Sequence, residues 1–143
     1  MAHLQQQDDC EIEIVKQMRL LGLIVTSELK WKSNTEHMVA KAFKKLWIIR
    51  RLKSQGAVKH YLVDMYIKQV RSILELAVQA WAWVVTMEEK DDIERVYKGA
   101  LQVILGDQYK SYPIALSLVG LETLECRRSK LCLKFALKAE KTP

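Results

Sequence analysis

The segment from residue 18 to residue 56 constrains the fold of this chain more than any other part. It begins as a short apolar, β-branched run with a Leu-Gly step, passes through a polar junction, and becomes a long stretch rich in Lys and Arg. β-Branched apolar runs predict strands, and apolar residues spaced three and four apart predict helices. This order therefore predicts a short strand that leads directly into a strongly basic helix.

A β-hairpin is predicted at residues 11–32. Residues 11–15 alternate between charged and apolar side chains, and residues 18–26 are apolar and β-branched, so the turn is expected at Lys16-Gln17. A lone two-stranded hairpin is only marginally stable in water. The two strands must therefore pack on helices or on another surface.

Residues 33–143 are predicted to form a bundle of four to five helices, so the expected fold class is mainly α with an N-terminal β-hairpin. Ser33 or Asn34 is the expected N-cap of the first helix, with Glu36 completing a capping box, and Gly56 is the expected stop. Helical spacing predicts a buried stripe on this helix made of Val39, Phe43, Leu46, Ile49 and Leu52.

The later helices are predicted at residues 57–84, 87–105, 111–118 and 122–140. Thr86 is the expected cap of the 87–105 helix, and Gly106 is its expected end. The 87–105 helix is expected to bury Ile93, Val96, Tyr97, Ala100, Leu101 and Ile104. The expected inner face of the 57–84 helix is Leu62, Met65, Tyr66, Val70, Ile73, Leu74, Ala77 and Trp81. The expected inner face of the last helix is Leu124, Leu131, Phe135 and Ala139.

The cations around the first helix are the main functional signal in the sequence. The chain has a net charge of +6 and a pI near 9.2, which favours an acidic partner. Such a helix can neutralise several phosphates, and the interleaved Trp31 and Trp47 favour nucleic acid over a merely solvated face. The candidate phosphate-binding residues are Lys30, Lys32, Lys41, Lys44, Lys45, Arg50, Arg51 and Lys53.

No catalytic or metal-binding pattern accompanies this helix in the sequence. Three cysteines and three histidines are scattered without Cys-x-x-Cys or zinc spacing, and glycine-rich phosphate loops are absent. Asp8-Asp9 is the one pair that resembles a Mg²⁺ site, but it lies in the polar residues 1–10, which are predicted to be a disordered tail. We therefore expect no enzyme activity and no cofactor in this chain.

Targeting signals are also missing from the sequence. The N-terminus has neither a basic nor an apolar leader region, and the longest apolar stretch, residues 76–85, is shorter than the roughly 20 residues that span a bilayer. We expect a soluble intracellular protein with no membrane partner, in the nucleus or the cytoplasm.

Five segments together resemble the last part of the reverse transcriptase of non-LTR retrotransposons of the LINE-like, jockey or RTE type. The segments are collinear: MRLLGLIVTSELKW (18–31), AFKKLWIIRRLKSQG (42–56), YIKQVRSILELAV (66–78), IERVYKGALQVILGDQYKSY (93–112) and LVGLETLECRRSKLCLKFALKAEK (118–141). In that family this region comprises the primer-grip hairpin and the thumb, which holds the primer-template duplex through its backbone. The resemblance implies that Leu20, Leu21 and Gly22 lie at the grip and that the cations of residues 41–53 face phosphate.

The resemblance also implies what this chain lacks. The family's fingers and palm, with an aromatic-x-Asp-Asp block that binds Mg²⁺, are expected upstream of residue 1 and would be the partners of this fragment. Without those carboxylates the chain is not expected to copy RNA. The chain departs from the family pattern at Gln79 and at residues 82–84.

Two alternatives to nucleic-acid binding remain open at this stage. Trp81 and Trp83 point about 200° apart on a helix, so one of them is expected either to meet a partner or to lie in a helix buried on two sides. An exposed Trp83 and an unpaired hairpin edge would favour a helical protein-interaction module. The departures at residues 79–84, with Gly99 inside a helix, would instead favour a translated, non-functional relic.

Overall fold

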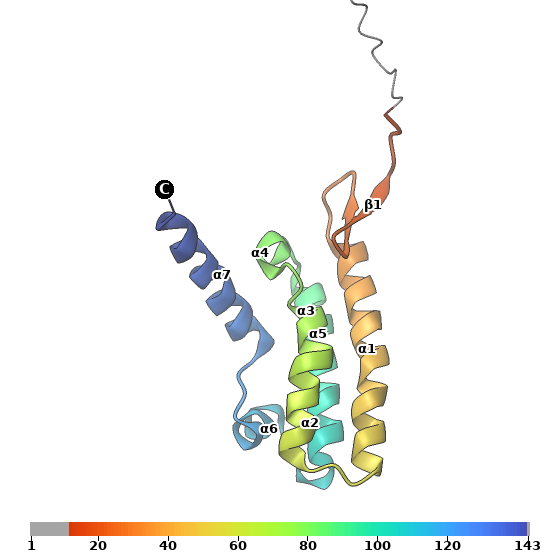
Figure 1. The fold of residues 1–143 in the computed structure, drawn as a ribbon, viewed down its shortest axis with the longest axis vertical. Helices are drawn as coiled ribbons and strands as arrows, with labels where there is room; N and C mark the ends of the chain where they lie inside the picture. Colours follow the sequence, from red (N-terminus) through yellow and green to blue (C-terminus); the bar gives the residue numbers. More distant parts are fainter. Residues whose placement is uncertain (1–11, 143) are drawn as a thin grey trace, which may run out of the picture.

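The computed structural model describes residues 12–142 and shows a mainly helical protein with an N-terminal β-hairpin, which confirms the predicted fold class (Figure 1). Asp8-Asp9, Cys10 and the predicted tail lie outside the described residues. The elements, in chain order, are β1 (Gln17–Leu20), β2 (Leu23–Thr26), α1 (Lys32–Ser54), α2 (Lys59–Tyr66), the π-helical turn η1 (Ile67–Arg71), α3 (Ser72–Leu74), α4 (Val78–Trp81), α5 (Met87–Leu105), the 3₁₀ turn η2 (Gly106–Gln108), α6 (Tyr112–Val119) and α7 (Leu124–Glu140).

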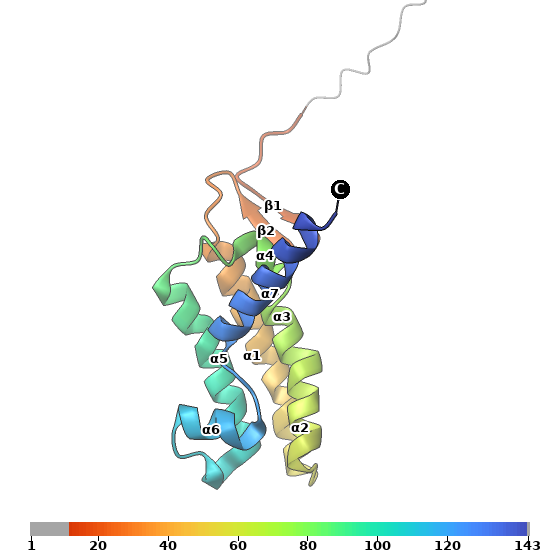
Figure 2. The same ribbon diagram turned by 90° about the vertical axis from the view of Figure 1, so that its left-hand side faces the viewer.

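The hairpin lies at one end of the bundle, next to the N-terminus of α1, and its turn is not where the sequence predicted it (Figures 1 and 2). β1 and β2 are antiparallel, with Leu20 opposite Leu23. The turn residues between them are Leu21 and Gly22, with φ of 48° and 84°. A two-residue turn with positive φ at both positions matches the right-handed twist of paired strands. The prediction of a turn at Lys16-Gln17 was therefore wrong, because the Leu-Gly step was assigned to the interior of a strand.

The start of α1 also differs from the prediction, and its end confirms it. Trp31 precedes the first helical residue, and neither Ser33 nor Asn34 caps the helix. Asn34 is buried instead, and its Oδ1 accepts a hydrogen bond from the Ile24 N–H at 3.0 Å, which ties α1 to β2. At the other end Gly56 has φ of 86°, as expected for a glycine stop.

The long helix predicted at residues 57–84 is interrupted twice. Its buried residues are spaced by four, and an α-helix turns 40° too far over each such interval. The wider π-helical turn η1 takes up this drift, and the chain then breaks at Ala77, which is left-handed with φ of 48°. The interruptions keep one row of side chains in the core: Leu62, Tyr66, Val70, Leu74 and Val78. Three other predicted inner residues, Met65, Ile73 and Ala77, are only half-buried.

α5 confirms the predicted bounds, cap and stop of the 87–105 helix. Thr86 and Glu89 form a reciprocal capping box, and Gly106 ends the helix with φ of 54°. Its six predicted core residues are all buried, and the Tyr97 ring stacks on Tyr66 with centroids 5.1 Å apart. α5 packs on α1 on one side and on α7 on another.

α7 runs back from α6 towards the hairpin end of the molecule, on the far side of the bundle from α1 (Figures 1 and 2). Leu124 is buried and Leu131 is half-buried, but Phe135 and Ala139 are exposed. The predicted inner face is thus correct for the first half of α7 and wrong for the second half. α7 packs on α4 and α5, and residues 133–140 of its second half are exposed.

Two tyrosines that contact the Tyr97 ring, Tyr66 by stacking and Tyr112 edge-on, are predicted to have opposite effects on stability when their hydroxyls are removed. The Tyr66 hydroxyl is buried without a hydrogen-bond partner among residues 12–142, whereas the Tyr112 hydroxyl donates to Glu94. Tyr66→Phe removes an unpaired polar group and should raise the free energy of unfolding by about 1 kcal/mol. Tyr112→Phe removes a bond to a carboxylate and should lower it by about 1.5 kcal/mol. Urea unfolding of the two variants would check the signs, and a destabilised Tyr66→Phe would contradict the assigned packing.

Candidate nucleic-acid interface

The basic surface of the protein is carried by α1, which forms one side of the bundle (Figure 1). Its core-facing stripe contains Met38, Ala42, Leu46 and Ile49, which confirms the prediction for Leu46 and Ile49. Phe43 is exposed, while Val39 and Leu52 are half-buried. Thr35, Met38 and Ala42 are buried in their place, so the first half of the buried stripe lies on a different side of α1 from the one predicted.

Three exposed residues form a row on the outer face of α1: Lys44, Trp47 and Arg51. Residues spaced i, i+3 and i+7 share one face of a helix. The Trp47 side chain is 64% exposed between the two cations, which is unusual for so large an apolar ring. This row combines a flat aromatic ring with two long cationic side chains. We define the α1 basic face as this row together with Lys41, Lys45 and Arg50.

The remaining cations of the face lie on either side of this row. Lys41 and Lys45 are one turn apart on the side towards α3, where Lys45 is half-buried, and Arg50 is exposed on the opposite side. Within residues 12–142, no carboxylate forms an ion pair with any of the five cations of the α1 basic face, which are Lys41, Lys44, Lys45, Arg50 and Arg51. Their charges are thus available to an external polyanion.

Lys53, the eighth predicted phosphate ligand, points into the protein instead. Its Nζ donates a hydrogen bond to the Val103 carbonyl at 2.5 Å, from α1 to the end of α5. It also lies where a side chain on Gly106 would be, 2.7 Å from the position of a Cβ. Lys53 is therefore a structural residue that joins two helix ends, and its inclusion in the phosphate-binding set is not supported by its geometry.

Lys30 and Lys32 lie apart from the α1 basic face, at the junction between the hairpin and the helix. Lys30 forms an exposed ion pair with Glu28 at 2.6 Å, and this partner raises the pKa of the lysine and lowers that of the glutamate. Lys32 is the exposed first residue of α1. An exposed pair of this kind contributes little to stability and can exchange its carboxylate for a phosphate.

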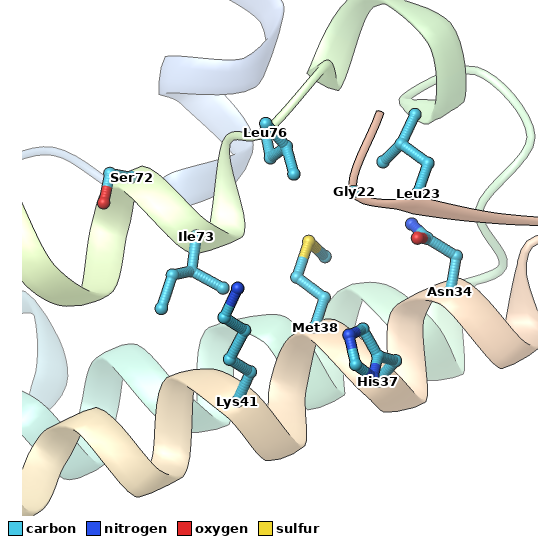
Figure 3. Close-up of a pocket in the computed structure, with 9 residues that line it drawn as sticks. All are labelled: Gly22, Leu23, Asn34, His37, Met38, Lys41, Ser72, Ile73 and Leu76. Carbon is cyan, nitrogen blue, oxygen red and sulfur yellow. The ribbon is translucent and has the colours of Figure 1, made fainter. Parts of the chain in front are cut away.

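Leu20, Leu21 and Gly22, which the resemblance places at a grip, form the end of β1 and the hairpin turn. Beneath the turn lies a cavity of about 210 Å³ between the hairpin, α1 and α3 (Figure 3). Figure 3 shows Met38, Ile73 and Leu76 lining it from α1 and from the α3 side, with Lys41 and His37 at its edge. This cavity could not be predicted from the sequence, because it depends on how the hairpin turn approaches residues 72–76.

The described residues hold no group of three or more His, Cys, Asp or Glu side chains that could bind a metal ion. Cys126 is exposed and Cys132 is buried, and both are free thiols. Among the helices that the structure describes, none combines the length and apolar character that crossing a membrane requires.

The chain was compared with protein-family models, with curated proteins and with solved structures. No match was found in any of the three comparisons.

Proposed function

We propose that this chain binds duplex nucleic acid without sequence preference, through contacts between the α1 basic face and backbone phosphates. The observation that carries the proposal is the row of Lys44, Trp47 and Arg51, exposed and continuous on the outer side of α1. Phosphate contacts fix a protein on a duplex but carry no sequence information. A surface made of cations and one aromatic ring fits that mode of binding.

The sequence resemblance to the thumb of a non-LTR retrotransposon reverse transcriptase supports the same proposal. Two of the five segments that carry the resemblance, residues 18–31 and 42–56, include most of the hairpin and the second half of α1. The family's aromatic-x-Asp-Asp block does not occur in this sequence. The proposed role is therefore to hold a duplex and not to extend it, with fingers and palm of the parent polymerase as the partners that would supply Mg²⁺ chemistry.

Binding of a labelled RNA–DNA hybrid is expected to weaken steeply with salt. Each neutralised phosphate releases a counterion, so four contacts would lower the affinity by about 10²-fold between roughly 50 and 200 mM salt. Fluorescence anisotropy at several salt concentrations would measure the slope, and circular dichroism would confirm that the chain is folded. A folded chain that does not bind at low salt would refute the proposal.

A second function is favoured by a different surface. A second region, suited to a protein partner, consists of exposed apolar side chains: Trp83 and, on α7, Leu133, Phe135 and Leu137. A complex that forms through this region would be insensitive to salt and lost in Trp83→Ala. A thermal melt without a cooperative transition would support neither function and would indicate a non-functional relic.

A further inference from the structure

Among residues 12–142, no strand other than β2 pairs with β1, so the outer edge of β1 is unpaired in this part of the chain. All four residues of β1 are exposed, and the preceding residues 12–15 have no regular structure and lead away from the bundle (Figure 1). Ile12 and Ile14 are 91% and 97% exposed, and Met18 and Leu20 are also exposed. An open edge that carries apolar side chains is a site for pairing with another strand.

The hydrogen bonds of the hairpin show which backbone groups of β1 are free. Ile24 lies opposite Arg19, and its N–H donates to Asn34 and not to β1. In an antiparallel ladder, bonded and non-bonded pairs alternate, so the N–H and C=O of Arg19 and Gln17 point away from β2. The bond from Ser27 N–H to the Lys16 carbonyl, 2.8 Å, fits the same alternation. The odd-numbered residues of this segment thus present donors and acceptors outwards.

We propose that a second copy of this chain pairs with this edge, antiparallel and with residue 16 on the two-fold axis. Glu13 then lies opposite Arg19 of the other copy, and Val15 lies opposite Gln17. These are pairs of odd-numbered residues, so their free backbone groups face each other. The result is a four-stranded sheet in the order β2, β1, β1, β2.

The side chains favour this partner and this register. Ile12 lies opposite Leu20 and Ile14 opposite Met18, which joins the apolar residues on one face, while the Glu13–Arg19 pairs form on the other. A shift by one residue would place apolar and charged side chains on the same face. A shift by two would pair Lys16 with Ile14 or Met18. The one unfavourable pair in the proposed register is Lys16 opposite Lys16 of the other copy, because the two charges are alike.

Sedimentation equilibrium would test the dimer, with Gln17→Pro as the decisive variant. Proline is tolerated at the first residue of a strand, and here it removes only the outward N–H, so the hairpin bonds remain. The wild-type chain should dimerise weakly, with a Kd between about 1 µM and about 1 mM. Gln17→Pro should weaken the dimer at least about tenfold, and Gln17→Ala, which keeps the N–H, should not.

Charge variants test the register independently, which matters if Gln17→Pro disturbs the hairpin. Glu13→Arg should weaken the dimer, and the double variant Glu13→Arg/Arg19→Glu should restore it, because each pair is then opposite in charge again. Lys16→Thr should tighten it by removing the like-charged pair on the axis. A chain that stays monomeric up to about 1 mM, or a dimer indifferent to these substitutions, would overturn the proposal.

Discussion

Replacing Lys41, Lys44, Lys45 and Arg51 with Glu in one variant should abolish binding of an RNA–DNA hybrid at a salt concentration where the wild-type chain binds. The change removes four cations from the α1 basic face and places four anions there, next to a polyanion. All four side chains lie outside the buried stripe of α1, so the fold should persist. We expect a loss of more than about 10³-fold in affinity at low salt, measured by anisotropy.

A matched control separates the α1 basic face from the net charge of the chain. The control replaces four exposed lysines outside α1 with Glu, which gives the same change in net charge: Lys110, Lys134, Lys138 and Lys141. This control should lose far less affinity than the α1 variant, because its lysines do not lie on the proposed contact surface. Equal losses would show that binding follows net charge, and unchanged affinity in the α1 variant would show that the wrong surface was assigned.

Trp81→Ala should destabilise the protein by about 3 to 5 kcal/mol. The Trp81 side chain is 0% exposed, and its Nε1–H donates to the Leu76 carbonyl at 2.8 Å, across the break at Ala77. The substitution empties a large volume beside α4 and leaves that carbonyl without its bond. Urea unfolding followed by circular dichroism would measure the loss, which approaches the whole stability of a typical small domain.

Trp83→Ala, two residues further along the chain, is the natural control. The Trp83 side chain is 81% exposed, so its removal should change the free energy of unfolding by no more than about 0.5 kcal/mol. Similar effects from the two substitutions would contradict the placement of Trp81 in the core. The sequence predicted Trp81 on the inner face of its helix with Trp83 pointing elsewhere, and the structure confirms that Trp81 is buried and Trp83 exposed.

α5 shows what could be predicted from local signals. Its cap, its stop and its buried row all follow from the residues themselves, because Thr86 and Glu89 are three apart and because its apolar spacing points to one side only. The cations of α1 could be placed on a helix for the same reason. The sequence could not show which of these cations are free and which bind within the protein, because Val103, the hydrogen-bond partner of Lys53, is 50 residues away in the sequence.

The fold class, the cap and stop of α5 and the presence of a basic helix could all be predicted from the sequence, since each depends on residues close together in the chain. Tertiary structure decided the rest. Four features depend on which elements, distant in the sequence, lie close in space: the turn at Leu21-Gly22, the break at Ala77, the exposed end of α7 and the direction of Lys53. Local spacing gives a side chain its place on a helix or strand, but only the neighbouring elements determine whether that face is covered.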